Sequence, residues 1–204
     1  VFAGHVARLA GLAVPQLVVG STTNDVLTRF FADGTMVIAE VVPTTSPSMD
    51  IQVSSNLERL LFEMNGRDGT MVGAQLDGFR ATGDFQLDPV QHAALADGWN
   101  GARFDDRAVR ACIAAEAEQS GTVLDPHTAV GVLAARACRR DPSIPMVALA
   151  TAHPAKFPDA VEAATGARPG LPDRLADLHQ RPERLTALPA DLAVVEDFVR
   201  AHRR

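Results

Sequence analysis

Short apolar runs that do not alternate with polar residues are the feature that most constrains the fold of this 204-residue chain. Four such runs, at residues 16–20, 36–42, 122–124 and 145–150, are separated by segments with helical spacing of apolar residues. Runs of this kind are typical of parallel strands that are covered on both faces. The strand–helix rhythm therefore predicts an α/β fold with a partial doubly wound, mostly parallel sheet.

The predicted sheet divides the chain into regions. We expect residues 1–65 and 106–165 to form one large α/β domain, because they contain the four strand patterns. Residues 66–105 alternate Gly-Asp turns with short helical patterns, and we interpret them as a mixed, helical insertion. The proline-punctuated residues 166–204 are predicted to form a helical C-terminal tail.

Composition and charge exclude several classes of function. The formal charge is −6 and basic residues cluster only at the very end, so neither nucleic acid nor an anionic membrane is an expected partner. No apolar stretch approaches the ~20 residues of a membrane span. Cys112 and Cys138 are too few and too far apart for a disulfide scaffold or a zinc site, and they fit buried thiols in a reducing cytoplasm. The histidines lack ligand spacing, so we expect no metal site.

Polar clusters follow the four predicted strands, at residues 21–25, 45–51, 125–128 and 151–156. Ligands of open α/β sheets bind beyond the carboxyl ends of the strands. We therefore expect the clusters to converge on one cleft, with one residue from each on the same sheet edge: Asn24, Ser48, His127 and Thr151.

Plainer interpretations of the same polar residues stay open. Clusters of Ser, Thr, Asn and Asp are also ordinary helix caps, which suits Asp125 before Pro126. His153 fits a hydrogen-bonded structural histidine. The chain has no G-x-S-x-G motif and no glycine-rich phosphate loop of the Walker or dinucleotide type, so those two enzyme classes have no support.

Three of the clusters resemble characteristic segments of threonine synthases. These are residues 46–51, which are followed by a similar helical stretch, residues 125–131 and residues 151–157. Residues 24–27 and 188–192 resemble two weaker elements of the same family. Order and spacing agree along essentially the whole chain, which therefore resembles roughly the C-terminal half of a threonine synthase.

The resemblance implies the fold and chemistry of the fold-type II pyridoxal 5′-phosphate enzymes, of which the tryptophan synthase β chain is another member. The family converts O-phospho-L-homoserine and water to L-threonine and phosphate. Thr151 would hydrogen-bond the nitrogen of the cofactor ring, and a hydroxyl there does not require that nitrogen to be protonated, as a carboxylate would. The other matching positions would line the cleft: Asn24, Ser48, Met49, Asp50, His127, Thr128 and His153.

Two departures from the family pattern limit this expectation. The family's Schiff-base lysine has no match, because the single lysine, Lys156, belongs to a different motif and is interpreted as a surface lysine. The family's loop for the cofactor phosphate would lie before residue 1. We therefore expect a missing N-terminal half of the same enzyme as a partner. A threonine-synthase-like phospholyase and a non-catalytic fragment remain alternatives.

Overall fold

The computed structural model describes residues 2–203 of the chain. They form two compact units, which meet between Gly170 and Leu171. The four polar clusters and all the described strands lie in the first unit. The second unit contains the helix α9 (Leu192–His202), which the sequence predicts for the tail.

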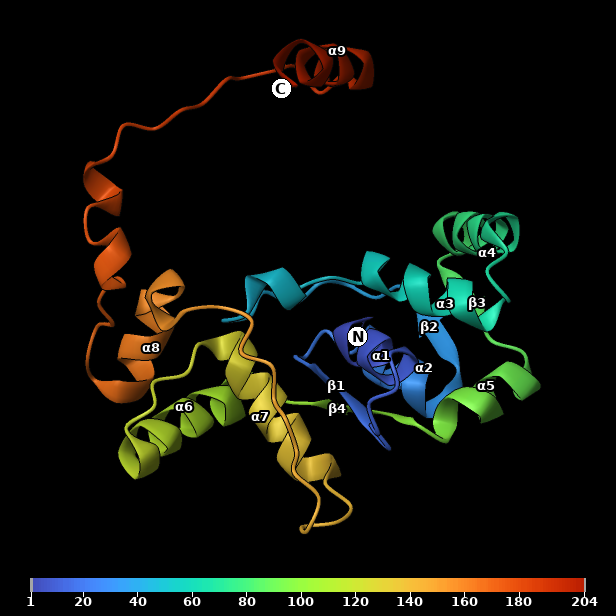
Figure 1. Ribbon diagram of the computed structural model, residues 1–204, viewed down its shortest axis with the longest axis horizontal. Coiled ribbons are helices and arrows are strands. Elements are labelled where there is room, and N and C mark those ends of the chain that lie inside the picture. The colour runs from blue at the N-terminus through green and yellow to red at the C-terminus, as the bar shows by residue number, and fades with distance from the viewer. Residues whose placement is uncertain (1, 204) are drawn as a thin grey trace. The chain divides into compact units, whose positions relative to one another are not determined.

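A parallel pair of strands forms the centre of the first unit (Figure 1). Strand β1 (Leu17–Ser21) confirms the strand predicted at residues 16–20. Its neighbour is β4 (Trp99–Arg103), paired so that Val19 faces Gly101. Because β4 lies within residues 66–105, that segment is part of the α/β core and not an insertion added to it.

Two glycines allow helices to approach this strand pair from opposite faces. A Cβ atom on Gly20 would lie 2.8 Å from Val130 Cγ1 in α7 (Pro126–Cys138), and one on Gly101 would lie 2.7 Å from Thr28 Cα in α2 (Val26–Asp33). Gly101 is level with Val19, the residue before Gly20, and successive residues of a strand point to opposite faces. The pair is therefore covered on both faces, as the predicted doubly wound α/β class requires.

The prediction of a parallel strand at residues 36–42 is wrong in its length and in the direction of its pairing. Strand β2 covers only Thr35–Val37 and pairs antiparallel with β3 (Asp84–Gln86). The pairing places Met36 and Phe85 against the aromatic core around Phe30, which decides the register. Beyond Val37, a hydrogen bond of 2.8 Å from Ile38 N to Gly83 O extends the contact between the two segments.

The other two predicted strands are absent from residues 2–203. Residues 122–124 form a loop, with Thr122 N bonded to Ser120 Oγ. Residues 145–150 are neither helix nor strand, and Val147 and Leu149 are exposed. A strand requires a neighbour for its backbone hydrogen bonds, and the described residues supply none to either segment.

Helices complete the first unit. They are α1 (Phe2–Leu9), α3 (Glu58–Met64), α4 (Gly69–Thr82), α5 (Pro89–Ala96), α6 (Asp106–Ser120) and α8 (Pro158–Thr165), with short 3-10 turns that include η1 (Pro47–Met49) and η3 (Pro154–Lys156). One buried cluster joins α2 to the β2–β3 side of the unit. A second lies between α6 and α7 and contains Ile113 and Val130. None of the helices within residues 2–203 is long and apolar enough to span a bilayer.

Candidate functional site

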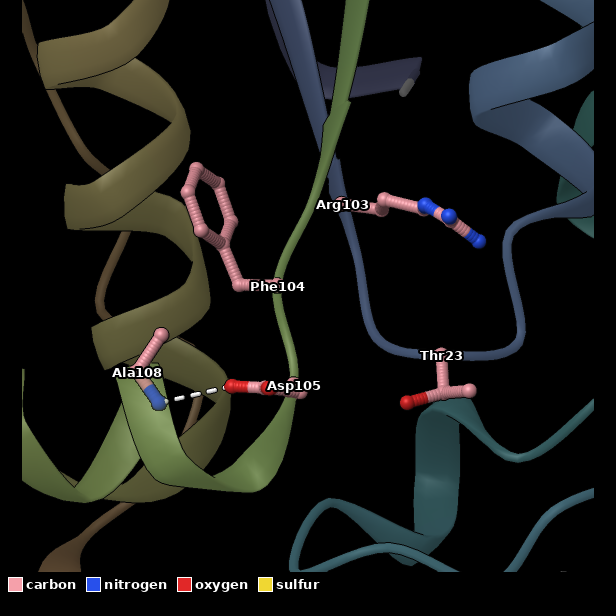
Figure 2. A pocket seen from close by; sticks show the side chains of 5 residues that line it. All are labelled: Thr23, Arg103, Phe104, Asp105 and Ala108. Atoms are coloured by element: carbon pink, nitrogen blue, oxygen red, sulfur yellow. Dashed lines mark hydrogen bonds between the residues drawn. The ribbon is translucent and has the colours of Figure 1, made fainter.

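The carboxyl ends of β1 and β4 open onto a shallow pocket of about 390 Å³ (Figure 2). Arg103 and Phe104 project to opposite sides of the chain at the end of β4. Arg103 pairs with Asp25 at 3.0 Å, and Phe104 packs on the cluster between α6 and α7. Asp105 caps α6 by accepting a bond of 2.8 Å from Ala108 N. The charges around the pocket are thus already paired with partners from this chain.

Asn24 connects the first polar cluster with the second. Its side chain is 4% exposed, and its amide nitrogen donates to Val42 O at 2.7 Å and to Asp50 Oδ1 at 2.9 Å. Its amide oxygen accepts from Val42 N at 2.9 Å. The turn after β1 therefore holds the loop that contains residues 45–51. The sequence predicted that these two clusters would be neighbours.

The same loop is fixed at two further points. Asp50 accepts bonds from the backbone and hydroxyl of Thr44, at 2.8 and 2.6 Å. Asp106, in the first turn of α6, accepts from Thr45 N and Thr45 Oγ1, the latter at 2.9 Å. Met49 packs on the cluster between α6 and α7, whereas Ser48 is exposed at the tip. The loop is therefore held by hydrogen bonds at Asp50 and Asp106, and Ser48 within it is exposed.

Asp125 organises the start of α7. It is 1% exposed and accepts bonds from His127 N at 2.9 Å, from Thr128 N at 3.3 Å and from the Thr128 hydroxyl. Burial raises the pKa of Asp125, but the hydrogen bonds from His127 and Thr128 outweigh it and hold the pKa below its usual value. Asp125 is the helix cap that the sequence predicted, and it is also a buried carboxylate kept in its charged form.

His127 joins the third cluster to the fourth. Its side chain is 10% exposed, and its Nδ1 lies 3.3 Å from Asp125 Oδ1. The imidazole packs on the ring of Phe157, with the two ring centres 4.6 Å apart. Neither ring nitrogen makes a hydrogen bond with any residue that the structure describes. The Asp125 carboxylate is thus a polar neighbour of Nδ1, whereas Nε2 is buried without one in the described part of the chain, which is unusual for a buried polar group.

The fourth cluster is the most open part of the site. Thr151 is exposed in an irregular segment. His153 caps η3, its Nδ1 accepting from Ala155 N at 3.2 Å, and Lys156 is exposed with its ammonium group 5.7 Å from the centre of the Phe157 ring. Nothing near Lys156 buries its amine, as expected for a surface lysine.

Comparisons with known proteins agree along the full chain. A family model described as "Threonine synthase, C-terminal" matches residues 128–199. The threonine synthase of Pseudomonas aeruginosa is 47% identical over 203 residues, which are 99% of this chain and 43% of that protein. The structure of threonine synthase from Brucella melitensis, described as bound to PLP, has a TM-score of 0.86 at 45% identity and covers 100% of this chain and 44% of its own. The structure of threonine synthase from yeast has a TM-score of 0.81 at 32% identity, and the match covers 98% of this chain and 44% of that chain.

By sequence and by fold, this chain is similar to the C-terminal part of the threonine synthases. It spans less than half the length of the relatives named here. The α/β fold expected from the resemblance is thereby confirmed.

Contacts link the four threonine-synthase-like clusters one after another, in the order in which they follow along the chain. Asn24 binds Asp50, Met49 packs on the cluster between α6 and α7, and His127 packs on Phe157. Their expected arrangement at the ends of four parallel strands is wrong, because only the cluster after β1 directly follows a parallel strand. A shared role of these residues in binding stays a prediction.

The sequence predicted no role in this site for three residues: Arg103, Asp106 and Phe157. Arg103 ends a strand whose composition gave no strand signal, and Asp106 and Phe157 matter through partners distant in sequence. Among residues 2–203, no three His, Cys, Asp or Glu side chains gather as metal ligands would.

Proposed function

We propose that this chain is the C-terminal part of an enzyme that converts O-phospho-L-homoserine and water to L-threonine and phosphate with pyridoxal 5′-phosphate. The observation that carries the proposal is the match, over the whole chain, to a threonine synthase described as PLP-bound. The linked contacts of the four clusters support it, because they gather the family's segments into one region of the first unit.

The residues present fit one end of the cofactor. Thr151 is exposed, so its hydroxyl is open to the nitrogen of the cofactor ring. The loop with Ser48 at its tip is held by Asn24 and Asp106 and offers a second exposed hydroxyl. Lys156 is exposed, so we assign the Schiff-base lysine to the rest of the enzyme and not to this chain. When bound, the cofactor supplies the electron sink for carbanions formed on the substrate.

The rest of the enzyme is the partner that we propose for this chain. The apolar runs at residues 36–42 and 145–150 predict burial, yet several of their side chains are 40% to 78% exposed: Ile38, Val41, Val42, Val147 and Leu149. Exposed apolar segments of this kind mark surfaces that another polypeptide covers. The relatives are more than twice as long as this chain, so they contain the additional residues that such a surface needs. Both cysteines are free thiols, which fits the cytoplasmic location that we propose.

A chimeric enzyme tests the proposed reaction. This chain replaces the matching 43% of the Pseudomonas aeruginosa threonine synthase, and phosphate and threonine are both measured with O-phospho-L-homoserine as substrate. We expect the chimera to release the two products in equal amounts, and we expect the chain alone with added cofactor to release neither. Phosphate without threonine would instead identify a phospholyase. A folded chimera that binds the cofactor and releases neither product would contradict the proposal.

Substitution of Thr151 tests the contact to the cofactor ring. In the chimera, Thr151→Val replaces the hydroxyl by a methyl group of similar volume and removes one hydrogen bond of about 1 kcal/mol, or roughly fivefold in kcat. The cofactor absorption spectrum should shift as well. Thr70→Val, which changes an exposed threonine in α4, is the control and should alter neither. Wild-type turnover together with a wild-type spectrum would show that Thr151 is not the ring partner.

A further inference from the structure

Thr151 lies in a segment with little local support. Between the end of α7 at Cys138 and the start of η3 at Pro154, the chain contains no helix and no strand. The hydrogen bonds of a sheet therefore do not fix Thr151, as they would if residues 145–150 formed the predicted strand. The nearest structure that can hold it is the turn that follows.

That turn is compact and ends on an aromatic ring. Lys156 N donates to His153 O and Phe157 N donates to Pro154 O, both at 2.9 Å, which closes η3. Phe157 is the residue before α8, and its carbonyl oxygen accepts a hydrogen bond of 3.1 Å from Val161 N. The Phe157 side chain packs on His127, 4.6 Å between ring centres. His127 thus gives α7 a direct contact with the turn after Thr151, while α8 beyond it packs on α6.

His127 is itself held from its own helix. Asp125, 1% exposed, accepts a bond from His127 N and lies 3.3 Å from His127 Nδ1. Yet both ring nitrogens are buried without a hydrogen bond among the described residues. Burying an imidazole in this way carries a desolvation penalty that an apolar ring of the same shape would not. We therefore explain the imidazole by two contacts that act together: Asp125 orients it through Nδ1, and its ring packs on Phe157.

We propose that His127 is a positioning residue that sets the location of Thr151 through its ring contact with Phe157. The inference rests on the proposed function, since Thr151 matters only if it meets the cofactor. It makes two predictions that can be separated: His127 restrains the 151–157 segment in the chain itself, and its loss reduces turnover only through Thr151.

Hydrogen–deuterium exchange tests the first prediction without any cofactor. In this chain, His127→Ala should raise deuterium uptake in peptides that cover residues 151–157, whereas His127→Phe, which keeps an aromatic ring, should leave uptake near wild type. Phe157→Leu should reproduce His127→Ala, which guards against a folding defect of one variant. His92→Ala is the matched control, because His92 Nε2 is also buried without a partner, in α5. Unchanged uptake in both His127→Ala and Phe157→Leu would overturn the proposal.

Turnover of the chimera tests the second prediction through a double-mutant cycle. If His127 acts by placing Thr151, His127→Ala should lower kcat by at least the roughly fivefold expected for Thr151→Val, and the double variant should be no slower than His127→Ala alone. Losses that multiply would overturn the positioning role. So would a fall in kcat for His127→Phe at normal deuterium uptake, because the ring nitrogens would then contact a ligand directly. A Thr151→Val variant without effect would count against the proposed function, while the exchange result would still stand.

Discussion

Replacement of Asn24 offers the sharpest test of how the site is assembled. Its side chain, which is 4% exposed, makes two long hydrogen bonds of 3.4 Å, with Thr22 and Gln52, and three short ones, two to Val42 and one to Asp50. Asn24→Ala removes the three short bonds, and at about 1 kcal/mol for each of them the free energy of unfolding should fall by about 3 kcal/mol. This loss reflects only the missing bonds.

Asn24→Asp adds a repulsion to a smaller loss of bonds. The new carboxylate still accepts from Val42 N but faces Asp50, whose Oδ1 lies 2.9 Å from the present amide nitrogen. Two unit charges at that separation repel by about 6 kcal/mol at an effective dielectric constant of 20, and about half should remain after the side chains rotate apart. Together with about 2 kcal/mol from the two lost bonds, the expected total is about 5 kcal/mol.

Urea unfolding followed by circular dichroism measures both variants. At pH 7, Asn24→Asp should be about 2 kcal/mol less stable than Asn24→Ala, the difference between the two totals worked out from bonds and charge. Near pH 4 the gap should close, because one of two adjacent carboxyls takes up a proton and donates it to the other. The double variant Asn24→Asp with Asp50→Asn exchanges donor and acceptor and should recover most of the loss. Equal stability of the two single variants at pH 7, or no recovery in the double variant, would refute the pairing.

Two further predictions concern packing and the helix cap. Gly101→Ala should destabilise the chain by about 1–3 kcal/mol, because its Cβ would lie 2.7 Å from Thr28 Cα. The Cβ of Gly78→Ala in α4 would meet nothing within 4 Å, so this control should stabilise the chain by about 1 kcal/mol. Thermal unfolding measures both variants, and midpoints that shift in the same direction would contradict the prediction. Asp125→Asn should cost about 1 kcal/mol at neutral pH. Because the folded-state pKa of Asp125 is lowered, its stabilisation exists above the ordinary value of about 4 and is lost as the pH falls through the folded-state pKa. A difference from wild type that does not shrink as the pH is lowered below about 4 would contradict this assignment.

Elements with local signals were predictable from the sequence. The strand predicted at residues 16–20 corresponds to β1 (Leu17–Ser21), and Asp125 caps α7 at Pro126, because strand pattern and helix cap act within a few residues. Strand β4 gave no such signal. It contains Asn100 and Gly101, and the glycine is there because α2 approaches too closely for a side chain.

Elements that depend on distant partners were not predictable. Residues 36–42 and 145–150 have the apolar composition of buried strands, but a strand exists only where a neighbouring strand meets it. The same holds for the site. The sequence identified Asn24, Asp50 and His127 as members, whereas the bond between Asn24 and Asp50 and the packing of His127 on Phe157 follow from tertiary structure alone.

The pairing of β1 with β4 has a consequence for how the first unit folds. Leu17 faces Trp99, so about eighty residues must be closed into a loop before the first backbone bond of this pair can form. Closing such a loop costs about 4 kcal/mol of chain entropy by the logarithmic dependence on length. On a ribosome that adds about 5–20 residues per second, β1 waits about 4–16 s for its neighbour, whereas helices such as α4 form from contacts within themselves. The valines of β1 are without a strand neighbour throughout that interval, so this strand is where we expect association with chaperones or aggregation during synthesis to begin.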